Sequence, residues 1–277
     1  MKLSCLPVSY FPDIIGGQMS VAEWAREGAS LGLDGIDISI LFVQDFTPSG
    51  LASLRQQIED AGLGLTMVCT YPDFTHPDAD ERKRQLEQLA GYIDACGQLG
   101  AKYIRITSGQ GHPDTPRQQG IEWSVAGMTS ALPYATTSGV QLVFENHAKP
   151  GVWTYPDFCF PPDIFLELAR RTRFTDLGIN WDTCNIIAYG DDPLPVLQQV
   201  IDKVLTVHAS DTGTRGKLTH VLLGTGLTPF VETFRMLQQA GWDNWICIEE
   251  GSKLGHEGVA AATRFVRETW AKAKRSD

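Results

Sequence analysis

Residues 138–145 read SGVQLVFE, a stretch that joins the end of a helix to the start of a buried strand. Glycine ends helices well because it lacks the Cβ that would clash in a left-handed conformation. The apolar run behind it is short and nearly continuous, which is typical of a parallel strand buried on both faces. The pattern recurs as LGLDGIDI at 31–38, AGLGLTMV at 61–68, LGAKYIRI at 99–106 and AGWDNWICIE at 240–249. It predicts alternating helices and parallel strands.

Eight short apolar runs are candidate strands: 2–7, 35–38, 65–70, 103–107, 141–145, 177–182, 204–208 and 245–249. Helical patterns lie between them. Ser20-x-x-Glu23 predicts a capping box, residues 82–97 carry apolar side chains at helical spacing, and prolines open the helices predicted at 162–171, 193–200 and 229–240. Eight alternations in 277 residues predict an α/β fold, a (β/α)8 TIM barrel, as one domain over 1–277. An open doubly wound sheet is the alternative, but no Gly-x-Gly-x-x-Gly follows the first run.

The composition is that of an ordinary globular protein, with 43% hydrophobic and 20% charged residues. The net charge of −10 disfavours a nucleic-acid partner, and no apolar run is long enough to span a membrane. The six cysteines are scattered without a CxxC pair, and the N-terminus reads as a strand and loop rather than a signal peptide. These features favour a reducing, cytoplasmic location. A homo-oligomer stays open.

The last four predicted strands each end in a side chain that can bind a metal: Glu145, Asp182, His208 and Glu249. Active sites of such barrels lie at the C-terminal ends of the strands, where neighbouring strand ends converge. A lone glutamate or histidine there is more often a structural residue, but four in succession indicate a site. Three carboxylates and one imidazole favour one divalent cation, Mn²⁺ or Mg²⁺, with Co²⁺ or Zn²⁺ as further candidates.

The segments FENH, NWDTCN, VHASD, LLGTG and WICIEE, in that order, resemble the xylose-isomerase-like TIM-barrel superfamily, the sugar phosphate isomerase/epimerase group. The resemblance implies that Glu145, Asp182, His208 and Glu249 bind one divalent metal. It also implies that Glu145 and Glu249 are catalytic residues that flank the substrate and move protons.

The reaction that follows is isomerisation or epimerisation of a small polyhydroxy carbonyl compound, a sugar or sugar phosphate. One glutamate removes the α proton, a metal-bound cis-enediolate forms, and the other glutamate returns a proton. The alternative within the same chemistry is an inosose-type dehydratase, in which the enolate expels a hydroxyl group. A non-catalytic metal- or sugar-binding barrel is a third reading.

Six further residues are predicted to contact substrate: Tyr71, Arg105, His112, Asn185, Arg215 and His220. Arg105 lies within an apolar strand, so we expect it to be buried against an anion and either to orient Glu145 or to contact substrate. Arg215 resembles a substrate-contacting arginine of the family, whereas Asn185 replaces a histidine that several ketose epimerases and the endonuclease branch carry. His220 either belongs to the site or positions its loop. Glu250 and Asp211 are candidate acceptors for the second N–H of His208.

Overall fold

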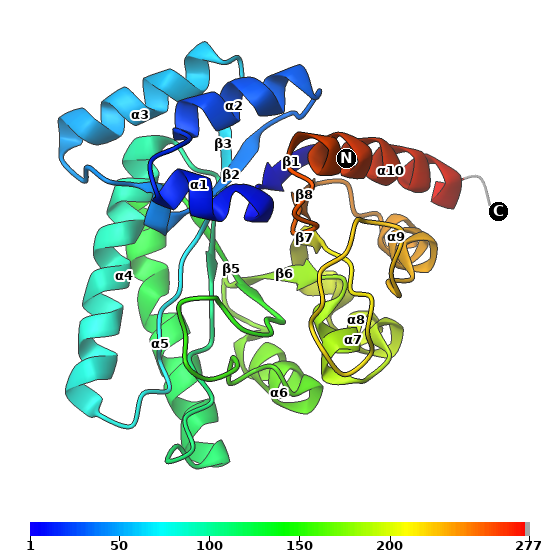
Figure 1. The fold of residues 1–277 in the computed structure, drawn as a ribbon. Coiled ribbons are helices and arrows are strands. Elements are labelled where there is room, and N and C mark those ends of the chain that lie inside the picture. Colours follow the sequence, from blue (N-terminus) through cyan, green and yellow to red (C-terminus); the bar gives the residue numbers. More distant parts are fainter. Residues whose placement is uncertain (275–277) are drawn as a thin grey trace.

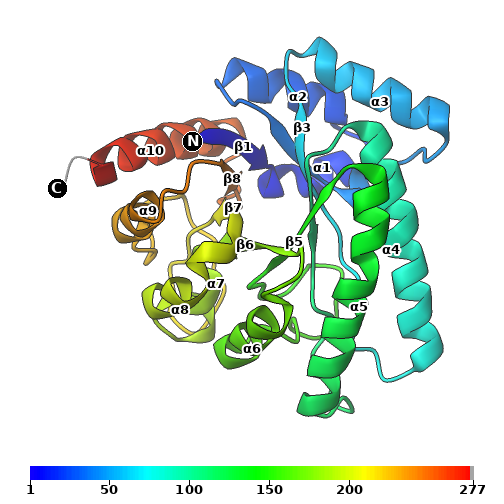
Figure 2. The same cartoon turned by 180° about the vertical axis from the view of Figure 1, so that it is seen from behind.

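The computed structural model describes residues 1–274 and contains eight parallel strands surrounded by helices (Figures 1 and 2). The strands are β1 (Lys2–Leu6), β2 (Ile36–Ser39), β3 (Leu65–Cys69), β4 (Tyr103–Ile106), β5 (Gln141–Glu145), β6 (Gly178–Asp182), β7 (Val204–Ala209) and β8 (Trp245–Glu249). Their order is β1-β8-β7-β6-β5-β4-β3-β2. Every predicted strand is confirmed, with its ends shifted by at most one residue.

The seam between β1 and β2 nearly closes the sheet into a barrel. The N–H groups of Asp34 and Gly35 donate to the Leu3 carbonyl at 2.8 and 3.2 Å, and Leu3 N–H donates to the Asp34 carboxylate at 2.8 Å. Inside the seam, Ser4 Oγ donates to Asp37 Oδ2 at 2.8 Å. The predicted TIM barrel is therefore confirmed, and the open sheet is excluded.

Helices connect successive strands on the outside of the barrel (Figure 1). The longer ones are α2 (Val21–Ser30), α3 (Pro48–Asp60), α4 (Ala79–Leu99), α5 (Arg117–Ser138), α6 (Pro162–Thr172), α8 (Pro193–Val200), α9 (Phe230–Gln239) and α10 (His256–Lys274). Short turns of helix are η1 (Val8–Tyr10), α1 (Phe11–Ile15), η2 (Ile40–Phe42), α7 (Asn185–Tyr189) and η3 (Ile201–Lys203). No helix among residues 1–274 is long and apolar enough to cross a membrane.

The local signals that set these helix ends are mostly confirmed. Ser20 and Glu23 form the predicted capping box. Gly139 ends α5 with a φ of +69°, the left-handed conformation expected of the junction glycine. Proline opens α6 and α8 as predicted, but α9 begins at Phe230, so Pro229 precedes its first turn. Helix ends are thus readable from local chemistry to within a residue or two.

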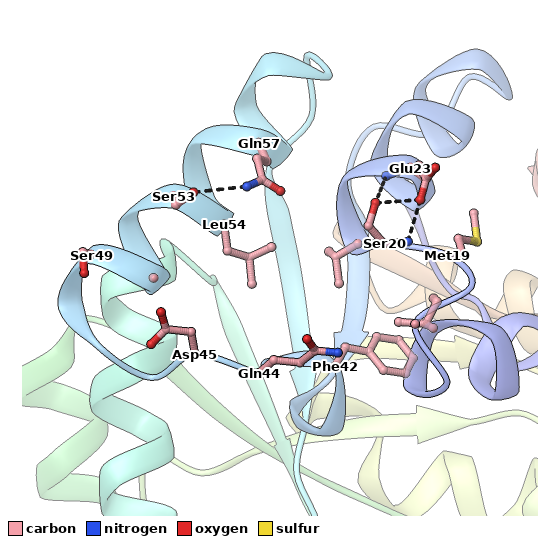
Figure 3. A pocket seen from close by; sticks show the side chains of 14 residues that line it. Met19, Ser20, Glu23, Phe42, Gln44, Asp45, Ser49, Ser53, Leu54 and Gln57 are labelled. Atoms are coloured by element: carbon pink, nitrogen blue, oxygen red, sulfur yellow. Dashed lines mark hydrogen bonds between the residues drawn. The ribbon is translucent and has the colours of Figure 1, made fainter.

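A hollow of about 570 Å³ lies in the outer helix layer between α2 and α3 (Figure 3). Ser20 and Glu23 hydrogen-bond each other on one side, and Gln57 donates to Ser53 on the other. Its lining comes from α1, α2, α3 and the segment before α3. None of the predicted site residues lines it.

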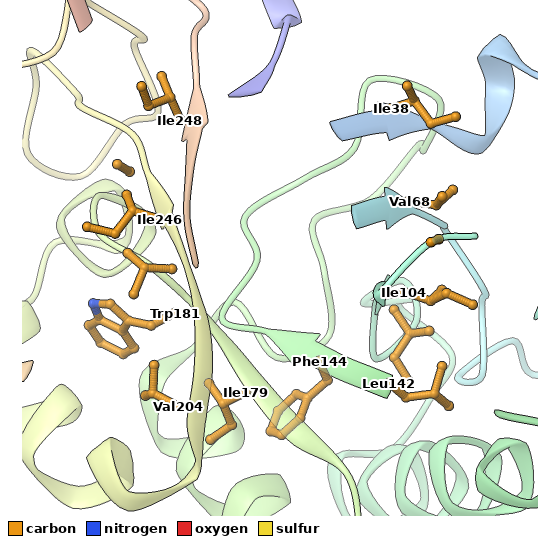
Figure 4. Close-up of a cluster of buried hydrophobic side chains, with 14 of the residues drawn as sticks. Ile38, Val68, Ile104, Leu142, Phe144, Ile179, Trp181, Val204, Ile246 and Ile248 are labelled. Atoms are coloured by element: carbon orange, nitrogen blue, oxygen red, sulfur yellow. The ribbon is translucent and has the colours of Figure 1, made fainter. Parts of the chain in front are cut away.

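The core has two layers because successive strand side chains alternate between the helices and the barrel interior. Phe144 and the matching side chains of other strands, such as Ile179 and Trp181, point outward and pack under the helices (Figure 4). The ring centres of Phe144 and of Phe165 on α6 lie 5.4 Å apart. The inward residues include a small apolar cluster of Leu6, Met67, Cys69, Val143, Trp245 and Cys247. At the C-terminal ends of β5 to β8, above that cluster, the inward positions are polar.

Candidate metal centre

The four side chains predicted to converge at the strand ends do converge. Glu145, Asp182 and Glu249 are the last residues of β5, β6 and β8, and His208 is the penultimate residue of β7. Each offers one ligand atom, and these four atoms lie within 4.8 Å of one another. The side chains of Glu145 and His208 are fully buried, whereas that of Glu249 is 15% exposed. Two ligands on opposite sides of a cation at 2.0–2.6 Å give separations of about 4–5 Å.

Two buried polar atoms of this cluster lack a hydrogen-bond partner in the protein. They are Glu145 Oε2 and His208 Nε2. The other ring nitrogen, His208 Nδ1, lies 3.2 Å from Glu145 Oε1 and 4.0 Å from Glu249 Oε2. Three carboxylates face this imidazole and one another, and a cation among them would neutralise their charge. The residues therefore fit a divalent metal.

The charges of the cluster also favour a bound cation. Burial, followed by repulsion from Glu249 and Glu145, raises the pKa of Asp182 to about 7. Burial and the charge of Glu145 also raise the pKa of Glu249. Burial alone would lower the pKa of His208, but the Glu145 carboxylate raises it well above its ordinary value. Without a cation the cluster therefore holds protons that a metal would displace.

Asp182 is fixed in place by three hydrogen bonds to its carboxylate. Its Oδ1 accepts from the backbone N–H groups of Cys184 and Asn185 at 2.8 and 2.7 Å, and its Oδ2 accepts from Ser210 Oγ at 2.6 Å. Asn146, next to Glu145, bridges to the Asp182 backbone through both amide atoms, at 2.8 and 2.9 Å. Asn146 and Ser210 thus position the ends of β5 and β6, and the sequence reasoning did not single out either one.

Arg105 is buried beside Glu145, as its place in an apolar strand predicted. Its Nε lies 3.1 Å from Glu145 Oε2, although the angle does not make a hydrogen bond. Its Nη1 donates to the Thr70 carbonyl at 3.2 Å, and its guanidinium carbon lies 5.0 Å from the centre of the Tyr71 ring. Burial would raise the pKa of Glu145, but the positive charges of His208 and Arg105 hold it well below its ordinary value. His208 and Arg105 therefore keep Glu145 ionised.

Replacing Arg105 by Met should destabilise the metal-free protein by about 3–5 kcal/mol, because Glu145 would lose its buried countercharge. The loss should be smaller in the metal-loaded protein, where the cation supplies that charge. Urea unfolding of both forms measures the difference. Arg55→Met is the control, since the Arg55–Glu59 pair is about half exposed and should contribute no more than about 1 kcal/mol. Equal losses of stability in the metal-free and metal-loaded protein would contradict the role of Arg105 as the countercharge of Glu145.

Three of the other predicted substrate residues lie at the strand-end face. Asn185 is 4% exposed and begins α7 directly after the Asp182 turn. The Tyr71 hydroxyl lies 3.1 Å from Ser39 Oγ, at the ends of β3 and β2. His220 packs on the loop after β8 so closely that a Cβ on Gly251 would lie 2.9 Å from its ring. Their contact with substrate remains a prediction.

His112 and Arg215 are held by other groups. His112 Nε2 lies 2.8 Å from Asp73 Oδ2, in the loops after β4 and β3. Arg215 is exposed, and its guanidinium donates to the carbonyls of Gly190 and Asp191 at 3.3 and 2.7 Å. These contacts give both residues a part in holding loops, and a role in substrate binding is still only predicted for them.

The two acceptors expected for His208 were wrong. His208 Nδ1 faces Glu145, and Nε2, which would carry the second N–H, has no hydrogen-bond partner. Asp211 accepts from the backbone N–H groups of the loop at 212–228, and Glu250 accepts from Ser252 N–H at 2.8 Å. Both carboxylates therefore organise the loops after β7 and β8.

Comparison with known proteins supports the same architecture. The model of the xylose isomerase-like TIM barrel family matches residues 25–269. The inosose dehydratase of Geobacillus thermodenitrificans (strain NG80-2) is 20% identical over 304 aligned residues, which cover 97% of each chain. The probable endonuclease 4 of Methanoculleus marisnigri (strain ATCC 35101 / DSM 1498 / JR1) is 28% identical over 196 residues, covering 65% of this chain and 66% of that protein.

Solved structures share the fold over nearly the full length. A D-tagatose 3-epimerase-like protein superposes with a TM-score of 0.81 at 15% identity, covering 99% of this chain and 98% of that one. The IOLI protein with a binding zinc atom also gives a TM-score of 0.81, at 18% identity, with 99% of both chains covered. Because the family model covers most of the chain, the protein belongs to the xylose isomerase-like TIM barrel family.

Proposed function

We propose that this protein is a divalent-metal-dependent isomerase or epimerase of a small polyhydroxy carbonyl compound. The observation that carries the proposal is the convergence of Glu145, Asp182, His208 and Glu249 within 4.8 Å at the C-terminal end of the barrel. The donor set favours Mn²⁺ or Mg²⁺, although the structural neighbour with zinc keeps Zn²⁺ among the candidates. A bound cation would act as a Lewis acid that polarises the substrate carbonyl and acidifies the adjacent C–H bond.

The exposure and contacts of these four residues indicate different roles for them. Asp182 and His208, both fully buried, would hold the cation. Glu249 is 15% exposed, so its carboxylate is open to a substrate at the barrel mouth, whereas Glu145 is fully buried and held beside Arg105. Glu145 and Glu249 stand at the two ends of the β5–β8 arc, so they flank a substrate bound between them. One removes the α proton, and the other returns a proton to the opposite face or the neighbouring carbon.

A dehydratase is the second candidate, and the inosose dehydratase relative favours it. Removal of the same α proton then leads to loss of a neighbouring hydroxyl group as water. The two reactions give different products from one site: an isomerase or epimerase conserves the substrate mass, while a dehydratase lowers it by one water.

DNA is a poor substrate candidate despite the endonuclease relative. The chain has a net charge of −10, and the predicted substrate contact after Asp182 is Asn185, which is a weak metal ligand.

All six cysteines are free and buried, which supports the prediction of a reducing, cytoplasmic location.

The test combines metal analysis of the purified protein with a D2O-exchange screen over ketoses, ketose phosphates and inososes. We expect about one divalent cation per chain and incorporation of deuterium at the carbon next to the carbonyl of one substrate class. Mass spectrometry of the product separates exchange with retained mass from dehydration. A protein that purifies without a metal, takes up none and exchanges no substrate would overturn the proposal.

A further inference from the structure

A second cavity lies over the ends of β2, β3 and β4, on the same rim as the candidate metal centre. Its volume is about 360 Å³, within the range of small-molecule sites. Its lining comes from the loops after β2 to β5 and from one side of α4. The residues that characterise its chemistry are Tyr71, Gln85, Gln88, Tyr92, Gln110 and Trp153.

Tyr71 connects this cavity to the candidate metal centre. It lines the cavity, and its ring centre lies 5.0 Å from the guanidinium carbon of Arg105. The Nε atom of Arg105 lies 3.1 Å from Glu145 Oε2. Tyr71 and Arg105 therefore lie between the cavity and Glu145, and the cavity adjoins the candidate metal centre on the same rim.

The lining combines aromatic faces with amide groups, the two features that bind sugars: C–H faces pack on rings, and hydroxyls pair with amides. Gln88 is oriented by donating to the Tyr92 hydroxyl at 3.1 Å. Gln110 anchors the loop that carries Trp153, because its Oε1 accepts from the N–H groups of Thr154 and Tyr155 at 3.0 and 3.2 Å.

The charge of the lining disfavours a phosphate. The lining includes the carboxylates of Asp73 and Glu81 but no Lys or Arg. Arg82 and Arg84 follow on α4 and already have partners, that of Arg84 being the lining residue Glu81. Arg82 donates to the carbonyls of His76 and Pro77 at 2.6 and 3.0 Å and stacks on Trp123, and Arg84 pairs with Glu81. His76 is the one lining residue that can become cationic, so an anion here would meet mainly negative charge.

We propose that this cavity binds a neutral glycosyl ring, so that the substrate is a ketosugar carrying a sugar substituent rather than a phosphorylated ketose. The inference rests on the proposed function, because it places the reacting end of the substrate at Glu145 and Glu249.

The binding test uses the magnesium-loaded protein and saturation-transfer NMR, with maltulose (glucosyl-fructose) and fructose 6-phosphate as probes. We expect saturation on the glucosyl protons of maltulose and little on fructose 6-phosphate. Gln88→Trp places an indole in the cavity from an exposed position of α4 and should remove the glucosyl signal. Gln98→Trp is the matched control, because Gln98 is exposed on the same helix and pairs with Asp94. No glucosyl saturation in the wild-type protein would overturn the inference.

The turnover test compares deuterium exchange into fructose, maltulose and fructose 6-phosphate. We expect kcat/KM for maltulose to exceed that for fructose at least tenfold, and Gln88→Trp to lower the maltulose value at least tenfold more than the fructose value. Equal values for fructose and maltulose, or a preference for fructose 6-phosphate, would overturn the inference and leave the proposed function standing. Exchange with none of the three by a metal-loaded protein would count against the proposed function, and the binding test would then decide the inference separately.

Discussion

Replacing Glu249 by Gln is expected to lower the rate of α-proton exchange by about 10²–10⁴-fold, the usual contribution of a positioned general base. Glutamine keeps the shape of the side chain and one oxygen donor, but it cannot accept a proton. Glu249 is the informative position because its side chain is 15% exposed at the mouth of the barrel, so the substitution should leave the buried pair of Glu145 and Arg105 intact. The measurement is deuterium incorporation per bound metal, with kcat and KM determined separately.

Glu145→Gln should cause a loss of similar size, together with lower stability, because Arg105 would then be buried without its carboxylate. Glu257→Gln is the matched control, since Glu257 is an exposed residue in the first turn of α10. The expected pattern is a fall in the exchange rate per bound metal for both site variants and no change for the control. If either variant kept full exchange with metal bound, the two-base mechanism would be wrong.

The strand ends were predictable because they depend on local chemistry. A buried parallel strand is mostly apolar along its length, so a carboxylate that closes the run marks its end, as Glu145 does for β5 and Asp182 for β6. Barrel topology then turns separations of dozens of residues into one cluster. The burial of Arg105 was predictable for a similar reason, because a charge in the middle of an apolar strand needs a partner.

The supporting contacts were not predictable because they depend on how the loops pack. Asn146 lies inside the quoted FENH motif, yet its bridge to the Asp182 backbone joins residues 36 positions apart. His147, the next residue, is buried with its Nδ1 at 3.7 Å from Asp157 Oδ2, and burial lowers its pKa to about 3. Glu250 and Asp211 accept hydrogen bonds from their own loops rather than from His208, and this too depends on how the loops pack. A single sequence does not show which of several polar residues will hydrogen-bond each other in the fold.

Removing the metal with a chelator is expected to abolish exchange and to destabilise the protein more at pH 8 than at pH 5. In the metal-free fold the pKa of Asp182 is raised from 3.8 to about 7, so between these values the folded chain holds a proton that the unfolded chain has lost. The stability of the metal-free protein therefore falls as pH rises from about 4 to about 7 and is level above that, as far as this group is concerned. The raised pKa of His208 also weakens metal binding at low pH, because its ring must lose a proton to become a ligand.

A metal at 100 times its Kd stabilises a fold by about 2.7 kcal/mol, or about 5–10 °C in Tm for a chain of this size. At pH 5 the proton on Asp182 competes with the cation and weakens its apparent affinity about 100-fold, which removes most of that gain. Thermal unfolding of chelated and Mn²⁺-loaded protein at both pH values measures the difference. Asp182→Asn should show little gain at either pH, because the carboxylate that exchanges its proton for the metal is gone. A gain of equal size at pH 5 and pH 8 in the wild-type protein would mean that the cation does not displace the Asp182 proton, and that it binds elsewhere than among these four residues.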